Sequence, residues 1–206
     1  MGCGGVPFCC GVAVSYLPGM EPSGAASEAS GDDWYTPPWL LAWLPSIALD
    51  PCYAAGSAVQ AAATLDLRRG DDGLAQPWQC GTGIVYVNPP FSNCGEWLAK
   101  CRQESKRLPN VIAALVPAFA GDGPWHAQVW GEAQLVGFVA GRVGFFDGTG
   151  RTETKGRGHA LILWGRGESC REVARHIAAA AATHPRAPFW TFARFSAVAT
   201  QPWLEV

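Results

Sequence analysis

The sequence predicts an α/β protein with one mostly parallel sheet, from two apolar runs and the segment between them. Residues 84–87 and 111–117 are short, apolar and rich in β-branched side chains, and prolines follow or end both runs, as is typical of buried strands. Residues 95–107 have the charges and the apolar spacing of a helix. Because strands that alternate with helices lie parallel, we expect these two strands to run in the same direction.

We expect a single domain at residues 32–185, between a leader and a tail. The chain has 206 residues, of which 49% are hydrophobic, and this is enough to bury a core. Residues 1–31 are rich in Gly, Ser, Ala and Pro without a sustained period, so the leader is predicted to be disordered. Residues 186–206 form an aromatic tail whose placement the sequence does not indicate.

Composition argues against a membrane protein and against a metal site. No apolar run reaches the roughly 18 residues that span a bilayer, and the first residues lack the basic start of a signal peptide. The eight cysteines include no Cys-x-x-Cys pair, which argues against a zinc site. We therefore expect a soluble cytoplasmic protein that binds no metal and no membrane. The sequence leaves its oligomeric state open, and a monomer is the simplest expectation.

The strand at residues 84–87 stops at Asn88-Pro89-Pro90-Phe91, where two prolines forbid further ladder hydrogen bonds. Open α/β sheets bind their ligands at such carboxyl ends of strands. Asn88 Oδ1 and the Pro89 carbonyl can accept the two hydrogens of an exocyclic amine, and Phe91 can stack on a planar ring. The motif therefore predicts a planar substrate with an amino group, positioned by a turn that Pro90 fixes.

Residues 36–44 predict a helix, with Thr36 as its N-cap, Pro37 at its first position and an apolar face behind them. Residues 46–50 predict a short strand that ends in the carboxylate of Asp50. The small-residue turn after it contains Pro51, Cys52 and Gly56. Small residues allow a ligand to approach the backbone closely, and a carboxylate at a strand end can receive its amino group or hydroxyls.

Residues 65–78 predict an ordered loop in which Asp66, Asp71 or Asp72 can bind hydroxyls of a ligand. Ordinary acids of a surface turn are the alternative for these three residues.

The later part of the chain predicts a short helix at 124–131, strands at 134–140 and 159–164, and a helix at 169–183. A glycine-rich loop at 141–158 joins the two strands and carries Arg142, Arg151, Lys155 and Arg157. Residues 1–97 have a net charge of −7 and residues 98–206 have +5. A flexible cationic loop in the basic half suits phosphates, although a merely solvated hairpin loop would look the same.

Together these motifs have the order and spacing of the small phage-type DNA N6-adenine methyltransferases, which the chain resembles over roughly residues 33–165. The resemblance rests on residues 34–44, Asp50-Pro51-Cys52, Asp71-Asp72-Gly73-Leu74 with Trp78, Val87 to Ser92, Trp97 to Lys100, and Gly141-Arg142. The chain departs from the usual cofactor loop at Cys52, where an aromatic residue is common, and at Ala54, where a glycine is common.

This resemblance implies a reduced Rossmann-like class I methyltransferase sheet, mostly parallel with an antiparallel edge pair. The sheet must be reduced because only 37 residues separate Asp50 from Asn88, too few for two complete β–α units. The implied reaction moves a methyl group from S-adenosylmethionine to N6 of adenine at specific sites in double-stranded DNA, with the base rotated out of the stack. The implied setting is a bacterium or a phage-infected host, for example in restriction-modification.

Each predicted site residue takes a role from this resemblance. The expected catalytic residues are Asn88, Pro89, Pro90 and Phe91. The expected cofactor-binding residues are Thr36, Pro37, Asp50, Pro51, Cys52, Gly56, Asp66 and Asp72. The expected DNA-binding residues are Arg142, Arg151, Lys155 and Arg157.

Two other functions share the same motifs. RNA adenine and protein glutamine methyltransferases resemble this chain at Asn-Pro-Pro-aromatic, but the chain has no recognisable RNA-binding appendage. A catalytically inactive DNA-binding relative is the second alternative, and Ala54 is the feature that favours it. The sequence does not indicate which DNA site is recognised.

Overall fold

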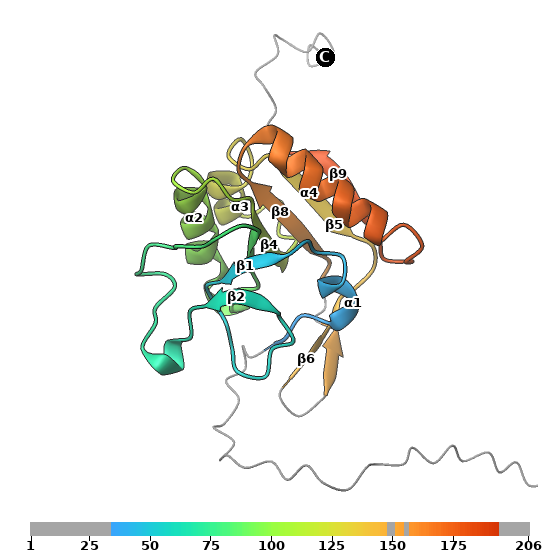
Figure 1. Cartoon of the computed structure of the whole chain (residues 1–206). Helices are drawn as coiled ribbons and strands as arrows, with labels where there is room; N and C mark the ends of the chain where they lie inside the picture. The colour runs from blue at the N-terminus through green and yellow to red at the C-terminus, as the bar shows by residue number, and fades with distance from the viewer. Residues whose placement is uncertain (1–33, 148–150, 155–156, 194–206) are drawn as a thin grey trace, which may run out of the picture.

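The computed structural model describes residues 34–147, 151–154 and 157–193. The main sheet contains seven strands: β1 (Ile47–Asp50), β2 (Ala61–Thr64), β3 (Ile84–Val87), β4 (Ile112–Pro117), β5 (Leu135–Val139), β8 (His159–Trp164) and β9 (Pro188–Phe192). Their order across the sheet is β2-β1-β3-β4-β8-β5-β9 (Figure 1). Strands β6 (Gly144–Phe146) and β7 (Thr152–Thr154) form a separate antiparallel hairpin.

The sheet confirms the predicted α/β class and its mostly parallel direction. Strands β2, β1, β3 and β4 are parallel neighbours. The two later strands, β5 and β8, are antiparallel as expected, and β8 lies between β4 and β5. The edge next to β5 is β9, which comes from the segment that the sequence left without a placement.

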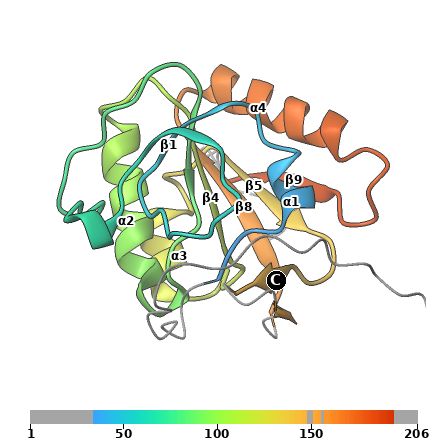
Figure 2. The ribbon, with the colours of Figure 1, turned by 60° about the horizontal axis from the view of Figure 1, so that its bottom comes forward.

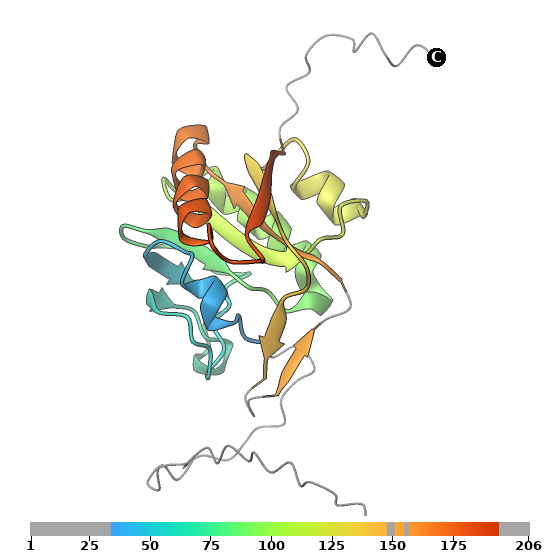
Figure 3. The ribbon, with the colours of Figure 1, turned by 90° about the vertical axis from the view of Figure 1, so that its right-hand side faces the viewer.

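The helices are α1 (Pro38–Leu41), α2 (Cys94–Ser105), α3 (Gly123–Gln128) and α4 (Gly167–Ala180), with short 3-10 helices at Leu67–Arg69 and Phe91–Asn93. Helices α1 and α4 lie on one face of the sheet, and α2 and α3 lie on the other (Figures 2 and 3). Every residue of β4 and β8 is buried, because helices cover both faces of these central strands.

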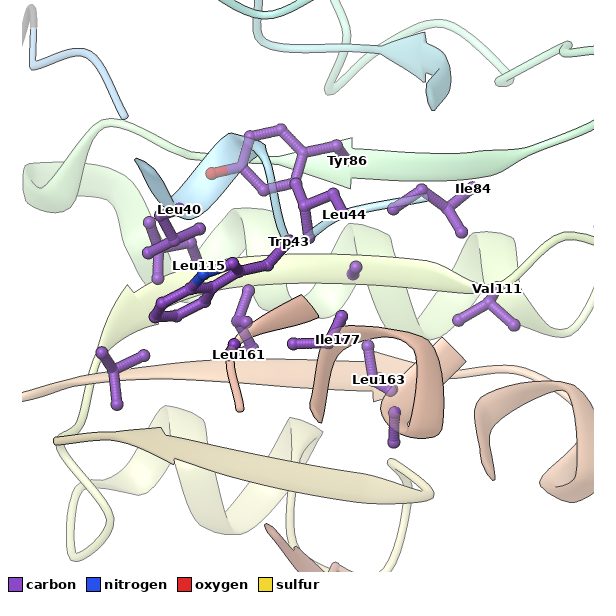
Figure 4. Close-up of a cluster of buried hydrophobic side chains, with 14 of the residues drawn as sticks. Leu40, Trp43, Leu44, Ile84, Tyr86, Val111, Leu115, Leu161, Leu163 and Ile177 are labelled. Atoms are coloured by element: carbon purple, nitrogen blue, oxygen red, sulfur yellow. The ribbon is translucent and has the colours of Figure 1, made fainter. Parts of the chain in front are cut away.

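Side chains alternate along β4 between two hydrophobic clusters. Ala113 and Leu115 join the cluster under α1 and α4, which also contains Tyr86 and Ile177 (Figure 4). Their neighbours Ile112, Ala114 and Val116 join the cluster under α2 and α3. This alternation is the period-2 pattern of a strand that is buried on both sides.

The part of the chain before β3 is reduced, as its length predicted. Residues 51–60 join β1 to its parallel neighbour β2 without a helix, and residues 65–83 join β2 to β3 with a single 3-10 turn. The sequence did not predict β2. Its residues Ala61–Thr64 have little intrinsic strand preference, and pairing with β1 stabilises them.

The helix predicted at residues 36–44 is shorter than expected. It spans only Pro38–Leu41, and Pro37 rather than Thr36 takes the N-cap position, without a side-chain hydrogen bond. The Thr36 hydroxyl instead forms a buried hydrogen bond of 2.7 Å with the Tyr86 hydroxyl in β3. A tertiary partner has therefore replaced the local cap that the sequence pattern predicted.

In the described segments, no helix has the length and the apolar character that a membrane span requires.

Candidate active site

A cavity of about 650 Å³ opens at the carboxyl ends of β1 and β3. Four stretches of chain contribute to its wall, within residues 34–36, 50–59, 65–74 and 88–97. The volume lies within the range of roughly 300–1,000 Å³ that small-molecule sites occupy, and the position is the one at which α/β sheets bind ligands.

Most of the predicted cofactor and catalytic residues meet in this wall. The lining includes Thr36, Asp50, Pro51, Cys52, Asp66, Asp72, Asn88 and Pro90. Four predicted residues lie outside the lining: Pro37 and Pro89 are buried beside it, Phe91 is half-buried, and Gly56 is exposed.

Asn88 follows directly after β3, and its side-chain amide has a fixed orientation. Its Nδ2 donates a hydrogen bond of 2.8 Å to the carbonyl oxygen of Trp34. Its Oδ1 is buried and has no hydrogen-bond partner among the described residues. Asn88 also lines the cavity, so its amide combines a held donor with an unpaired acceptor at the cavity wall. A buried acceptor of this kind is costly unless something pairs with it.

The segment Trp34–Thr36 connects the cavity with the β6–β7 hairpin. The backbone N–H and carbonyl of Tyr35 pair with those of Phe146 in β6, at 2.7 and 3.1 Å. The Tyr35 hydroxyl donates a hydrogen bond of 2.7 Å to the Ala55 carbonyl, on the turn after β1. The sequence indicated no site role for Trp34 or Tyr35, because their contacts involve backbone atoms distant in the chain.

Asp50 ends β1 and presents a buried carboxylate to the cavity. Only 4% of the residue is exposed, and its Oδ1 accepts a hydrogen bond of 3.1 Å from the Cys52 backbone. Burial raises the pKa of Asp50 to about 7, and the Cys52 amide offsets only part of this rise. A cation in the cavity would favour the ionised form of this carboxyl group.

The neighbouring thiol of Cys52 is protonated. Burial raises its pKa, and the adjacent Asp50 carboxylate raises it further. Cys52 is therefore a small apolar contact in the wall rather than a nucleophile.

Three further carboxylates line the wall after β2. Asp66 is buried, and its Oδ1 caps the 3-10 turn by accepting from the Arg68 backbone at 2.9 Å. Asp72 is exposed, and its Oδ1 accepts from the backbones of Leu74 and Ala75 at 2.9 and 3.2 Å. Asp71, which also lines the cavity, accepts weakly from the Asp66 backbone at 3.4 Å.

Gly73 allows this loop to lie against the turn after β1. A Cβ atom at position 73 would lie 1.9 Å from the Pro51 carbonyl oxygen and 2.9 Å from the Trp97 ring. The Gly73 carbonyl also accepts a hydrogen bond of 2.7 Å from Trp78 Nε1. Only glycine fits this close approach, which holds the acidic loop and the Asp50 turn on two sides of one cavity.

Phe91 packs in a cluster of three rings next to Asn88. The centroids of Phe91 and Phe145 are 5.3 Å apart in an edge-on arrangement, and those of Phe91 and His159 are 5.5 Å apart. Phe145 belongs to β6 and His159 to the first position of β8, so the cluster joins the Asn88-Pro89-Pro90-Phe91 turn to the hairpin. Nothing in the sequence marked Phe145 or His159 as site residues.

The predicted DNA-contacting residues lie around the hairpin, and all those described are exposed. Arg142 precedes β6, and Arg151 precedes β7 and forms an ion pair of 3.5 Å with Glu153. The guanidinium of Arg157 lies 4.4 Å from the centroid of the Phe119 ring. Lys155 lies outside the described residues.

Within residues 34–147, 151–154 and 157–193, no group of three or more His, Cys, Asp or Glu side chains could hold a metal ion.

Comparison with known proteins agrees with this geometry. The family model for the DNA N-6-adenine-methyltransferase (Dam) family matches residues 24–174, which is most of the chain and includes both the cavity and the three-ring cluster. A search of curated proteins returned no match. The extent of the family match is decisive, and the chain belongs to the DNA N-6-adenine-methyltransferase family.

Proposed function

We propose that this protein transfers a methyl group from S-adenosylmethionine to the N6 amino group of adenine, at specific sites in double-stranded DNA. The observation that carries the proposal is the amide of Asn88, whose Nδ2 is held by the Trp34 carbonyl while Oδ1 stays buried and unpaired among the described residues. This is an acceptor prepared for a donor that arrives with the substrate, and an exocyclic amine supplies such a donor.

Asn88 and Pro89 orient the amine in this mechanism. Hydrogen bonds from N6 to Asn88 Oδ1 and to the Pro89 carbonyl draw both hydrogens away from the nitrogen lone pair, which is then directed at the methyl group. An amide is not basic, so Asn88 positions the amine without keeping its proton, and the proton passes to solvent. Pro90 fixes the turn, and Phe91 supplies a face on which the base can stack.

The cavity fits S-adenosylmethionine in both size and charge. Its wall holds the buried carboxylate of Asp50 and the carboxylates of Asp66 and Asp71, which suit a cationic ligand with ribose hydroxyls. When bound, this cofactor supplies an electrophilic methyl group on a positively charged sulfur. Ala54, where the chain departs from the usual cofactor loop, lines the wall of a cavity that has a volume of about 650 Å³.

DNA would approach the carboxyl edge of the sheet, where the hairpin and the catalytic turn lie close together. Exposed Arg142, Arg151 and Arg157 surround this edge, and Lys155 belongs to the same loop. Contacts to phosphate would position the duplex, and the target adenine would leave the base stack to reach Asn88.

We further propose that the enzyme acts as a monomer in the cytoplasm. All five cysteines within the described segments are free thiols, as is usual in a reducing compartment.

Methylation-sensitive sequencing of DNA from cells that express the protein tests this function, because it reports the modified base and its sequence context together. We expect N6-methyladenine at a defined motif, absent from cells that lack the protein. Unmethylated DNA together with transfer of labelled methyl groups to RNA or protein would identify a different acceptor. No transfer to any polymer would support the inactive DNA-binding alternative.

A further inference from the structure

His159 has two polar atoms that the structure does not explain. The residue is 1% exposed, and both Nδ1 and Nε2 are buried without a hydrogen-bond partner among the described residues. Burial lowers the pKa of His159 to about 4, so the ring is neutral near physiological pH. A neutral imidazole has one N–H donor and one acceptor nitrogen, and leaving both unpaired in the interior is unfavourable.

The position of His159 in the sheet suggests what its nitrogens are for. It begins β8 opposite Pro117, the last residue of β4, and therefore lies at the same edge of the sheet as Asn88. Its ring contacts Phe91 and Phe145, with centroid distances of 5.5 and 4.8 Å. Asn88, which follows β3, and His159, which begins β8, therefore carry unpaired polar atoms at the same edge of the sheet, and Phe91, three residues after Asn88, contacts the imidazole ring.

We propose that His159 is a base-contacting residue, whose imidazole N–H donates a hydrogen bond to a ring nitrogen of the adenine held by Asn88. This inference rests on the proposed function. Adenine has a ring nitrogen acceptor on each side of its amino group, N1 and N7, so one base can pair with Asn88 Oδ1 and with His159 together. Binding of the base would then pair Asn88 Oδ1 and the imidazole N–H of His159, two of the three polar atoms that lack partners.

This contact also sets a selectivity. Guanine has a carbonyl oxygen at C6 in place of the amine, so it offers no amino group to Asn88 at that position. Its N1 carries a hydrogen and its N7 remains an acceptor, so the His159 contact itself excludes guanine only if it is made to N1. Thymine has no exocyclic amine. Cytosine offers an amine next to an acceptor nitrogen, so the smaller size of its ring must exclude it rather than this hydrogen-bond pattern.

Access to His159 requires a ring to move. Phe91 and Phe145 cover the imidazole, and Phe145 belongs to the hairpin that lies outside the main sheet. The hairpin is joined to Tyr35 by two backbone hydrogen bonds. A shift of the Phe145 ring when DNA binds this hairpin would open a path between the catalytic turn and the imidazole.

A double-mutant cycle, which combines a protein variant with altered substrate bases, tests the hydrogen bond between His159 and the base. The substrates are duplexes with the methylation site mapped by sequencing, containing adenine, 7-deazaadenine or 1-deazaadenine at the target position. We expect one of the two deaza bases to lower kcat/KM of the wild-type enzyme by about 3- to 10-fold. The His159→Phe enzyme should lose activity on adenine and no longer distinguish that deaza base from adenine.

A purely structural histidine would give a different pattern. We call the ratio of kcat/KM on adenine to kcat/KM on the deaza base the deaza penalty. Equal deaza penalties in wild type and His159→Phe would overturn the inference, even if both enzymes methylate adenine. No methylation of DNA adenine by the wild type would instead overturn the proposed function, and the inference with it. The control is Trp125→Phe, which removes an unpaired buried N–H in α3, away from the cavity wall, and should keep the wild-type deaza penalty.

Thermal unfolding provides a second readout that guards against misfolded variants. Replacing His159 by Phe retains an aromatic ring against Phe91 and Phe145 and removes two unpaired polar atoms. We expect the variant to be at least as stable as wild type while it is less active, which is the combination typical of a residue kept for function. A lower Tm with an unchanged deaza penalty would show that His159 only packs the core.

Discussion

The two halves of the main sheet differ in what covers them. In the covered half, formed by β4, β8 and β5, helix α2 packs on β4 and β8, α4 packs on β5, and every residue of β4 and β8 is buried. In the open half, formed by β1 and β2, the connections at 51–60 and 65–83 contain no α-helix, and no residue of β2 is buried. The strand that ends at Asn88, β3, lies between the halves.

The difference shows how a reduced fold still builds a cavity at the ends of its strands. Where crossover helices are absent, the loops after β1 and β2 contribute their polar side chains to the cavity wall. Close approach of Gly73 to Pro51 replaces helix packing as the contact that holds these loops together. We therefore expect changes in the interior of the covered half, away from the strand ends that face the cavity, to affect stability, and changes in the open half to affect ligand binding.

The largest effect on stability is expected in the covered half, at Leu115. This side chain is fully buried in the cluster under α1 and α4, so Leu115→Ala should lower the free energy of unfolding by about 2–5 kcal/mol through reduced burial and a residual cavity. Urea denaturation followed by circular dichroism measures it. The matched change in the open half, Ala63→Ser on exposed β2, should change stability by less than about 0.5 kcal/mol. Equal losses would remove the distinction between the halves.

Asp50 is expected to stabilise binding rather than folding. Its pKa is raised to about 7 by burial, so the folded protein holds a proton there that the unfolded chain releases near pH 4. Stability from this group is therefore present below about pH 4 and is lost as the pH rises through about 7. Asp50→Asn should avoid this loss and be more stable than wild type at pH 8, by on the order of 3 kcal/mol.

Two measurements examine Asp50→Asn. Urea midpoints of the ligand-free proteins at pH 5 and pH 8 should show that the advantage of the variant grows with pH. Calorimetry at pH 8 should show weaker binding of S-adenosylmethionine, because the carboxylate that faces the cation is gone. A constant difference in stability across this pH range, or unchanged affinity, would mean that the role belongs to Asp66 or Asp71.

A smaller effect is expected from the cationic loop at the hairpin. Replacing Arg151, Lys155 and Arg157 by Gln should weaken DNA binding and reduce the log–log salt slope by roughly 0.9 for each phosphate that the loop no longer neutralises. Affinity measured over a salt series checks this. Arg171 and Arg175 on α4, both ion-paired with Glu168, provide the control, and replacing them should leave the slope unchanged. If the plots of log affinity against log salt concentration are parallel for the loop variant and wild type, the DNA-binding surface lies elsewhere.

Sequence predicted the covered half better than the open half, for a physical reason. Strands β4, β5 and β8 and helix α2 have strong local periodicity, so these elements follow from the pattern of apolar residues. The strand Ala61–Thr64 has no such pattern and depends on hydrogen bonds from β1. Thr36 has the local chemistry of an N-cap, yet its partner is Tyr86, 50 positions away.

The same limit applies to the candidate site. The motif at Asn88-Pro89-Pro90-Phe91 predicted a polar amide at a strand end, and Asn88 does line the cavity, because strand, proline and amide occur in one short stretch. The carbonyl of Trp34 that orients Asn88 comes from a residue 54 positions earlier, and any residue type has a carbonyl. His159 begins an apolar strand and has no local feature that distinguishes it from a core residue.

The methyl-transfer rate of Asn88→Ala tests the central claim most directly. Under single-turnover conditions, with a duplex that contains the mapped site, the rate should fall by about 10²–10³-fold, because the amine loses its fixed acceptor. Affinity for S-adenosylmethionine should remain within about threefold of wild type, a change below 1 kcal/mol. Asn110→Ala is the control, since this amide ties only the backbone carbonyls of Gly81 and Gly83, and it should keep the wild-type rate. A wild-type rate in Asn88→Ala would contradict the assignment of Asn88 as the residue that positions the amine.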